Sequence, residues 1–190
     1  MSDSLVVLDA SALINLLGCG SPAVILDALA GRCAIEEKTL AEILQDPFTN
    51  GPAGPSIGRL LSKSTLTVQR MSPTAYADYL ELVSSPLETA LGHGESAALA
   101  HADDVRATVV LDDRKARRIG KSRFPKCDQW TSVKLFRVAA DLCGLPRNEI
   151  GSLIHFAREN ARMHILDFDQ PWVDELPRFR TRPQPTGQGA

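Results

Sequence analysis

The stretch LVVLD, residues 5–9, is a short continuous apolar run that ends at an acid. A run of this kind is typical of a strand that is buried on both faces, as the strands of parallel sheets are. The stretch ATVVLDD, residues 107–113, repeats the arrangement later in the chain and ends at two acids. We therefore predict two buried parallel strands, each followed directly by carboxylates.

Predicted helices alternate with these strands. Ser21-Pro22 and Ser72-Pro73 each place a serine before a proline, which is typical of a helix start. Further strands are predicted at 33–35 and 66–69, and further helices at 11–17, 22–30, 39–44, 95–102, from near Asp113, at 131–142 and at 148–161. The alternation predicts an α/β fold with a mainly parallel central sheet and helices on both faces.

Length and composition set limits on the class of protein. The chain has 190 residues, of which 44% are apolar and 23% charged, and this suits one ordinary domain. We expect that domain to span 1–165, followed by a largely disordered C-terminal extension, 166–190. The segment 46–58 is rich in proline and glycine, and we predict a mobile loop or flap there.

Charge and cysteine usage bear on partners and location. The formal net charge of −2 gives no overall attraction to nucleic acid or to an anionic membrane, so an anionic partner requires a local basic patch. The four cysteines and four histidines fit no zinc spacing, which favours free thiols and a cytoplasmic location. No stretch resembles a signal peptide or reaches the roughly 18 apolar residues of a membrane span, so we expect no membrane partner.

Five acids occupy positions that favour a shared site. In an open parallel sheet, ligands collect outside the carboxyl ends of the strands. Asp9 ends the first apolar run, and Asp112 and Asp113 end the later one. Glu42 lies in TLAEIL and Glu95 opens the helix after LGHG. Both segments are otherwise built for burial, where an ionised acid is costly unless it is paired or bound to a cation.

The residue types in this cluster indicate its chemistry. Carboxylates gathered in one place repel one another, which raises some of their pKa values and favours a divalent cation. Oxygen ligands without convergent histidine or cysteine point to Mg²⁺ or Mn²⁺. Such a site supports phosphodiester hydrolysis, because the metal activates a water and stabilises the leaving oxygen.

Each acid also has a simpler interpretation when it is taken alone. Asp9 and Asp113 are both favoured helix N-caps, and neither needs a metal to explain it. Glu42 and Glu95 taken singly are ordinary, partly exposed helix carboxylates. The order and spacing of all four together favour the shared acidic site.

A basic run follows the second pair of aspartates. Seven cations fall within thirteen residues: Arg114, Lys115, Arg117, Arg118, Lys121, Arg123 and Lys126. The run is either a solvated helix face or a track for an RNA backbone, with Arg114, Arg117 and Arg118 as the candidate substrate contacts. Arg117 lies one helical turn from Asp113, where it would pair with that carboxylate or grip the scissile phosphate. Few aromatic residues are placed for base stacking, and Trp130 and Trp172 are interpreted as packing residues.

Four motifs together resemble the PIN-domain family, which includes bacterial toxin ribonucleases and related small archaeal and bacterial proteins. They are VVLDASALINLL (6–17), TLAEIL (39–44), LGHGESAALAHA (91–102) and VVLDDRKAR (109–117). The last two resemble one PIN branch more than the commonest toxin branch. The resemblance implies a PIN-like three-layer sandwich.

The resemblance also implies roles for particular residues. Asp9, Glu42, Glu95 and Asp113 match the four acids of the family pattern and are the implied catalytic residues. Asp112 occupies a slot that is often polar in the family, as a second metal ligand or as a support for one. The implied metal ligands are therefore Asp9, Glu95, Asp112 and Asp113. Ser11 matches a small hydroxyl residue that orients the first carboxylate or a metal-bound water, and it is counted among the implied substrate-binding residues.

The implied activity is that of a Mg²⁺- or Mn²⁺-dependent endoribonuclease with a 5′-phosphate product. The implied partners are RNA, an antitoxin protein if the chain is the toxin of a toxin–antitoxin pair, or a second copy in a homodimer. Glu36 and Glu37 lie close to Glu42 in the sequence and are alternatives for the second acid of the family pattern. Residues 121–130 read KSRFPKCDQW where the family has a short strand and a small-residue turn.

Two other classes of function remain open at this point. One is a PIN-fold module that binds RNA or protein without turnover, which would hold if the acids lie too far apart to share a cation. The other is a phosphatase with an aspartyl nucleophile. That chemistry usually requires a second aspartate two residues after the first, and this chain has Ser11 there.

Overall fold

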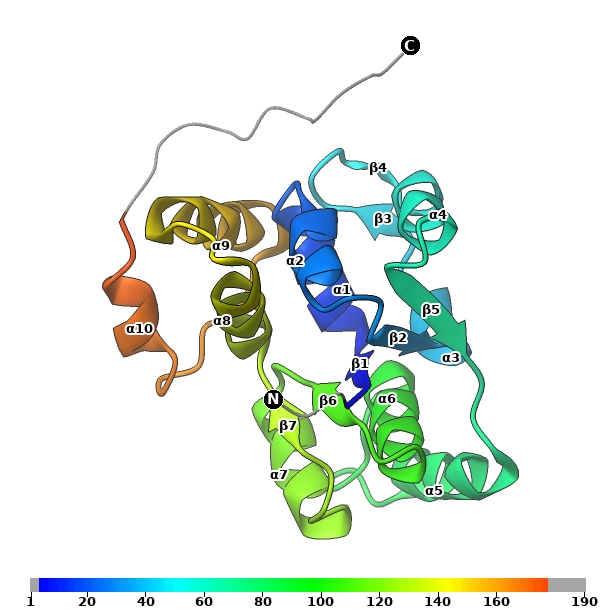
Figure 1. Cartoon of the computed structure of the whole chain (residues 1–190). Coiled ribbons are helices and arrows are strands. Elements are labelled where there is room, and N and C mark those ends of the chain that lie inside the picture. The colour runs from blue at the N-terminus through cyan, green and yellow to red at the C-terminus, as the bar shows by residue number, and fades with distance from the viewer. Residues whose placement is uncertain (1–3, 178–190) are drawn as a thin grey trace.

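The computed structural model describes residues 4–177 and contains a five-stranded parallel sheet (Figure 1). Its strand order is β5-β2-β1-β6-β7, and every neighbouring pair of strands is parallel. The strands are β1 (Val6–Leu8), β2 (Cys33–Glu36), β5 (Leu66–Gln69), β6 (Thr108–Val110) and β7 (Gln129–Trp130). The two apolar runs read from the sequence are thus adjacent central strands, with Leu8 opposite Val110.

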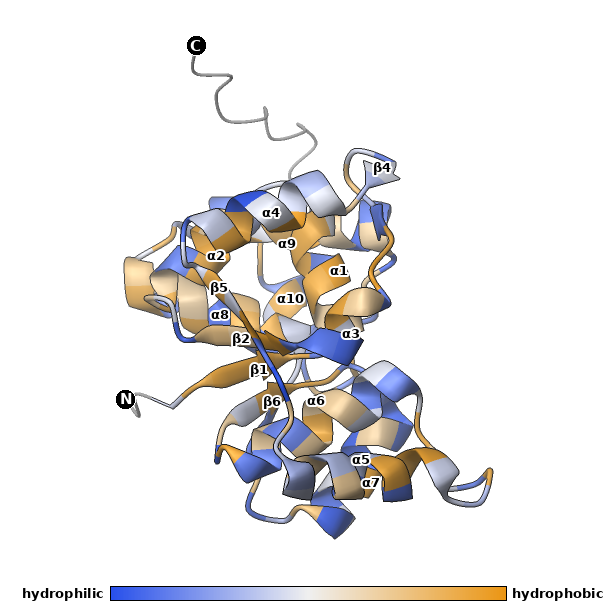
Figure 2. Cartoon of the chain, turned by 90° about the vertical axis from the view of Figure 1, so that its right-hand side faces the viewer, coloured by the Kyte–Doolittle hydropathy of each residue, from blue (hydrophilic) through white to orange (hydrophobic). Residues whose placement is uncertain are grey.

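Helices cover both faces of this sheet. They are α1 (Ala10–Gly18), α2 (Pro22–Ala28), α3 (Glu37–Ala41), α4 (Gly54–Ser62), α5 (Pro73–Ser84), α6 (His93–Asp104), α7 (Arg114–Arg123), α8 (Ser132–Cys143), α9 (Arg147–Ala161) and α10 (Gln170–Asp174). Figure 2 shows α1, α2, α4, α8 and α9 on one side of the strands and α5, α6 and α7 on the other. The predicted α/β sandwich with a mainly parallel sheet is confirmed.

The central strand faces a separate apolar core on each side. Val6 and Leu8 pack in the core beneath α1, α2, α8 and α9, whereas Val7 packs with Val109 and Leu111 beneath α6 and α7. All three residues of β1 are fully buried. Burial on both faces explains why this strand is a continuous apolar run instead of an alternating one.

The segment 46–58 differs from its prediction. It forms an antiparallel hairpin, β3 (Gln45–Asp46) with β4 (Gly51–Pro52), and the first part of α4. The buried Asp46 carboxylate holds it together, accepting hydrogen bonds from Phe48 N at 2.9 Å and from Ser56 Oγ at 2.6 Å. The loop prediction was wrong because proline fits the first turn of a helix, where its missing N–H is not needed.

The C-terminal extension is ordered as far as the structure describes it. Val173 and Leu176 are buried in the main core, Leu166 is also buried, and Trp130 and Trp172 pack against that core as predicted. Residues 166–177 therefore depart from the predicted disorder, because their apolar side chains find a surface formed by α8 and α9. The remainder of the extension, 178–190, lies outside the described residues, and the 165/166 boundary stays a prediction.

Two further expectations bear on location. Cys19, Cys33, Cys127 and Cys143 are free thiols. In residues 4–177 no single helix is long and apolar enough to cross a membrane. The helices α1 and α2 reach that length and composition only as a pair bent by 119°.

Candidate acidic active site

Asp9 follows β1 and begins α1. Its Oδ1 accepts a hydrogen bond from Ala12 N at 2.6 Å, and its Oδ2 accepts one from Ser11 Oγ at 2.8 Å. The side chain is buried, with the residue 2% exposed. Burial raises the pKa of Asp9 to about 8, and the charges of Asp112 and Glu95 add to the rise. Asp9 is therefore a helix cap and a member of an acidic cluster at once.

Asp112 follows β6 and is held by a polar network from two distant helices. Its Oδ1 accepts from Ser132 N at 2.7 Å, and its Oδ2 accepts from Ser132 Oγ at 2.5 Å and from Asn15 Nδ2 at 2.9 Å. Burial raises the pKa of this carboxyl, while the bonds from Ser132 and Asn15 lower it. These bonds fix the carboxylate in one orientation.

Asp113 and Glu95 are more open to solvent than Asp9 and Asp112. Asp113 is exposed and caps α7, where its Oδ1 accepts from Ala116 N at 2.7 Å. Glu95 lies in the first turn of α6, half-buried, and its Oε2 accepts from Gly92 N at 3.2 Å. Burial raises the pKa of Glu95, followed by the charges of Asp113 and Glu42. Glu95 thus links the strand-end aspartates to Glu42.

Glu42 directly follows α3, which ends at Ala41 and not at residue 44 as predicted. Its carboxylate is exposed and lies against Gly94, where an added Cβ would sit 3.0 Å from Glu42 Cδ. Thr39 Oγ1 donates to Gly94 O at 3.1 Å and holds α3 on α6. The carboxylate therefore lies beside the helix turn that carries Glu95.

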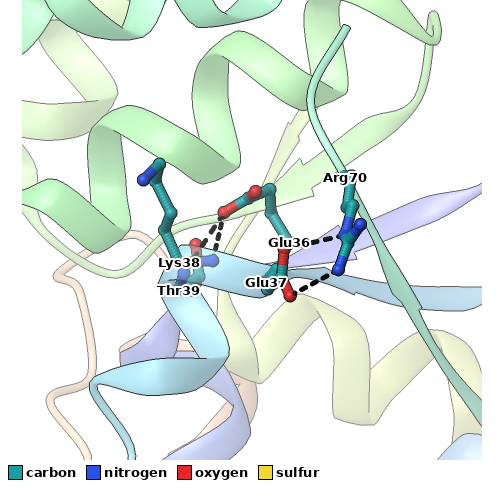
Figure 3. Close-up of polar contacts among 5 residues, drawn as sticks. All are labelled: Glu36, Glu37, Lys38, Thr39 and Arg70. Atoms are coloured by element: carbon teal, nitrogen blue, oxygen red, sulfur yellow. Dashed lines mark hydrogen bonds and ion pairs between the residues drawn. The ribbon is translucent and has the colours of Figure 1, made fainter.

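The two neighbouring glutamates have other partners (Figure 3). Glu36 is buried and caps α3, because its Oε2 accepts from Lys38 N at 2.6 Å. Glu37 pairs on the surface with Arg70, at 2.9 Å between Nε and Oε2. Both carboxylates therefore have partners of their own, whereas the charge of Glu42 acts on Glu95.

A cavity of about 520 Å³ opens beside these acids; Glu95, Asp112 and Asp113 line it, whereas Asp9 and Glu42 do not. Its lining includes Glu95, Asp112, Asp113, Ser11, Asn15 and Arg114, together with Arg162 and His164 beyond the end of α9. Within the described residues no three acid, histidine or cysteine side chains lie close enough to hold one metal ion together. Three of the acids thus share one cavity, and the like charges of the cluster repel one another. A divalent cation that drew them inward would relieve this repulsion.

The family assignment agrees with this arrangement. The model of a PIN-domain family, DUF3368, matches residues 5–124. The chain belongs to the PIN-domain family. The matched residues contain all five acids and helix α7, whereas Arg162 and His164 lie beyond them. No curated protein and no solved structure matches the chain. PIN domains are nuclease-type folds that typically use divalent metals, and they often bind RNA or act in toxin–antitoxin pairs.

The predicted substrate arginines of this PIN domain differ in their surroundings. Arg114 pairs with Asp167, its Nη2 lying 3.0 Å from each carboxylate oxygen. Arg117 donates to Leu111 O at 3.1 Å and to Trp130 O at 2.8 Å. The predicted pairing of Arg117 with Asp113 is therefore wrong, because its guanidinium reaches back to the ends of β6 and β7. Arg118 is exposed, as a substrate contact must be.

Arg162 and His164 were missed by the sequence reading. They reach the cavity because α9 packs on α1, where Asn160 Nδ2 donates to Gly18 O at 2.9 Å. Arg162 adopts a left-handed backbone conformation with φ of 56°, which ends α9 at the cavity wall. No local motif signals either residue, because their position depends on packing between segments far apart in the chain.

Proposed function

We propose that this PIN domain is an endoribonuclease that hydrolyses RNA phosphodiester bonds with Mg²⁺ or Mn²⁺. The observation that carries the proposal is the cavity at the carboxyl edge of the sheet that Glu95, Asp112 and Asp113 line, with Asp9 and Glu42 beside it. Burial raises the pKa values of Asp9 and Glu95, and neighbouring carboxylates add to the rise: Asp112 and Glu95 act on Asp9, and Asp113 and Glu42 act on Glu95. Oxygen ligands of this kind suit hard divalent cations.

The roles of the residues follow from their surroundings. Asp9, Glu95 and Asp113 would hold the cation, with Glu42 beside Glu95. A bound cation supplies activation of a water and neutralisation of the charge on the phosphate. Ser132 and Asn15 hold the Asp112 carboxylate in a fixed orientation beside that site, where it would contribute negative charge.

Cations that line the same cavity would receive the substrate. Arg114 and Arg162 line the cavity and would contact the phosphates of the bound strand. Ser11 lines the cavity and donates to the Asp9 carboxylate, which helps to fix the orientation of that carboxylate. The family resemblance adds a 5′-phosphate product to this proposal.

The test is cleavage of a single-stranded RNA of mixed sequence by the purified full chain. We expect cleavage with Mg²⁺ or Mn²⁺, none with chelator, and a loss of at least about 100-fold in Asp9→Asn, as is common when an electrostatic catalytic group is removed. Asp27→Asn is the matched control, because Asp27 is exposed on α2 and outside the cavity. Cleavage that survives both chelator and Asp9→Asn would refute the proposal.

A binding module without turnover is the second candidate. It is favoured by the absence, within residues 4–177, of three acids close enough to share a cation, and by the internal hydrogen bonds of Asp112. This candidate predicts RNA binding of equal affinity with and without metal, and no product over long incubation. Metal-dependent product formation excludes it.

We extend the proposal to a cytoplasmic toxin ribonuclease of a toxin–antitoxin pair. Its support is the family and the four free thiols. Expression of the full chain should arrest bacterial growth, and Asp9→Asn should not. The molecular mass of the purified protein in solution distinguishes a homodimer from a monomer of 20.6 kDa. A monomer is the form that would be free to bind an antitoxin protein.

A further inference from the structure

A second cavity, of about 450 Å³, lies beside the acidic one. Residues of α7 and of the C-terminal extension line it: Arg114, Arg117, Arg118, Lys121, Leu166, Asp167 and Phe168. We name it the α7 groove. Arg114 lines both cavities, so the groove and the acidic cavity are adjacent.

The α7 groove is basic. Four cations line it against the single carboxylate of Asp167. Arg114 pairs with that carboxylate, and Arg117 is bound to backbone carbonyls. The side chains of Arg118 and Lys121 have no hydrogen bond or ion pair with any residue in the described part of the chain.

The spacing of the cations fits a linear polyanion. Residues 114, 118 and 121 are separated by four and three positions, so they share one side of α7. At 1.5 Å per residue they span about 10 Å along the helix. A row of cations beside the acidic cavity, two of them unpaired in the described residues, favours a nucleic-acid backbone, which carries a phosphate at every nucleotide.

Phe168 adds an aromatic surface to this groove. The residue is 65% exposed, while the Arg117 guanidinium lies 5.6 Å from the centre of its ring. Its neighbours are fixed: Leu166 is buried, and Thr131 Oγ1 donates to Asp169 Oδ2 at 2.7 Å. An exposed ring on an anchored segment provides a stacking surface that needs little ordering when a ligand binds.

We propose that the α7 groove is a nucleotide-binding subsite, in which a base stacks on Phe168 and phosphates contact Arg118 and Lys121. The strand then passes Arg114 into the acidic cavity. The identity of the ligand as RNA rests on the proposed function. Stacking requires an unpaired base, so the subsite selects single-stranded over duplex RNA. Phe168 lies outside the family-matched residues 5–124, which makes the subsite a property of this chain's extension.

The subsite is tested by RNA binding in the Asp9→Asn background of the full chain, with chelator present so that the probe stays intact. The probe is a short fluorescein-labelled single-stranded RNA of mixed sequence, followed by anisotropy. Phe168→Ala should weaken binding about tenfold or more, which is the usual effect of removing one stacked base contact. Phe168→Trp should retain affinity, because tryptophan offers a larger stacking face.

Two controls separate stacking from general effects. Val24→Ala removes an exposed apolar group from α2, outside the groove, and should leave affinity unchanged. An abasic oligonucleotide of the same length should bind Phe168→Ala and the parent equally, because it has no base to stack.

The phosphate contacts are tested through salt dependence. The double variant Arg118→Ala/Lys121→Ala should lower the slope of log affinity against log salt by about 0.7 per cation lost. Lys63→Ala, at the end of α4, is the matched control and should leave the slope unchanged.

The outcomes distinguish the subsite from the nuclease proposal. RNA affinity that is unchanged in both Phe168→Ala and Arg118→Ala/Lys121→Ala overturns the subsite even if the wild type cleaves RNA. Binding that depends on Phe168 and on base stacking supports the subsite even if no cleavage is found, and the nuclease proposal then fails alone.

Discussion

The acids of this PIN domain fall into two regions with opposite surroundings. Asp9 and Asp112, which we call the buried pair, follow the central strands and are 2% and 7% exposed. Glu42, Glu95 and Asp113, which we call the outer acids, lie at helix ends and are exposed or half-buried. The buried pair accepts several hydrogen bonds per carboxylate, whereas Glu95 and Asp113 each accept one.

This difference separates two tasks within one site. The buried pair is fixed by the fold, and its charge is costly without a cation because burial raises both pKa values. The outer acids are accessible and can shift toward a cation that arrives from solvent. Changes in the buried pair should therefore alter stability as well as activity, and changes in the outer acids should alter mainly activity.

The largest effect is expected on the stability of the metal-free protein. The folded pKa of Asp9, about 8, lies above the ordinary value of 3.8, so the folded state binds this proton more tightly than the unfolded state. The stabilising contribution is complete below the ordinary value and is lost as pH rises from 3.8 to about 8. Asn at position 9 cannot ionise and can still accept from Ala12 N. Asp9→Asn should therefore raise the free energy of unfolding at pH 8 by several kcal/mol.

Urea unfolding in chelator at pH 5 and at pH 8 measures this effect. The wild type should lose stability between the two values relative to Asp9→Asn. Asp27→Asn, the exposed control on α2, should follow the wild type. Parallel pH dependence of Asp9→Asn and wild type would show that Asp9 is ionised at no cost, and the distinction between the buried pair and the outer acids would fail.

A divalent cation should reverse the same penalty. At a concentration of about 100 times its dissociation constant, a ligand that binds only the folded state adds about 2.7 kcal/mol. For a chain of this size that corresponds to a rise of roughly 5–10 °C in melting temperature. Mn²⁺ at pH 8 should produce such a rise in the wild type and a much smaller one in Asp9→Asn. An equal rise in both proteins would place the cation elsewhere.

The adjacent aspartates after β6 sharpen the comparison. Asp112→Ala removes the acceptors for Ser132 and Asn15 and leaves buried donors unpaired, which should cost about 3 kcal/mol of stability. Asp113→Ala removes one helix cap and should cost about 1 kcal/mol. For cleavage we expect the reverse order, with Asp113→Asn losing more activity than Asp112→Asn. The Asn variants are used for this comparison because Asn keeps the helix cap of Asp113 and removes only the charge. Equal activity of the two Asn variants would contradict the choice of Asp113 over Asp112 as a metal ligand.

Much of the fold was predictable because its signals are local. The two apolar runs that end at acids specify strands buried on both faces, and parallel pairing then brings Asp9 and Asp112 together. Ser72 caps α5 as predicted, with Ala75 N donating to its Oγ at 3.1 Å. Ser21 precedes α2 but makes no side-chain cap hydrogen bond. The signal that holds there is Pro22, which suits the first turn of a helix.

The remaining contacts have no local signal. Ser132 reaches Asp112 across 20 positions of the chain, and Asn15 reaches it across 97. Phe168 and Arg162 come to the site only because the segments after α8 fold back over the cavity. Arg117 shows the limit most clearly. It lies one helical turn from Asp113, as predicted. Its guanidinium nevertheless binds the carbonyls of Leu111 and Trp130, and helical spacing cannot reveal that these carbonyls lie nearby.

The smallest effect is expected at Gly94, where Glu42 meets α6. A methyl group there overlaps the Glu42 carboxylate, which is exposed and free to turn away. Gly94→Ala should therefore leave stability unchanged or slightly higher, since alanine favours a helix by up to about 1 kcal/mol. Cleavage should fall several-fold, as it should in Glu42→Gln, which removes the charge without moving the chain.

Gly58→Ala is the matched control for Gly94→Ala, because a methyl group at Gly58 in α4 meets nothing within 4 Å. It should leave kcat/KM for RNA cleavage unchanged. If Gly94→Ala and Glu42→Gln both cleave RNA at the wild-type rate, Glu42 plays no part in the site, and Glu95 and Asp113 are the only outer acids that act. A loss in both variants with stability preserved instead assigns the carboxylate of Glu42 a place beside Glu95.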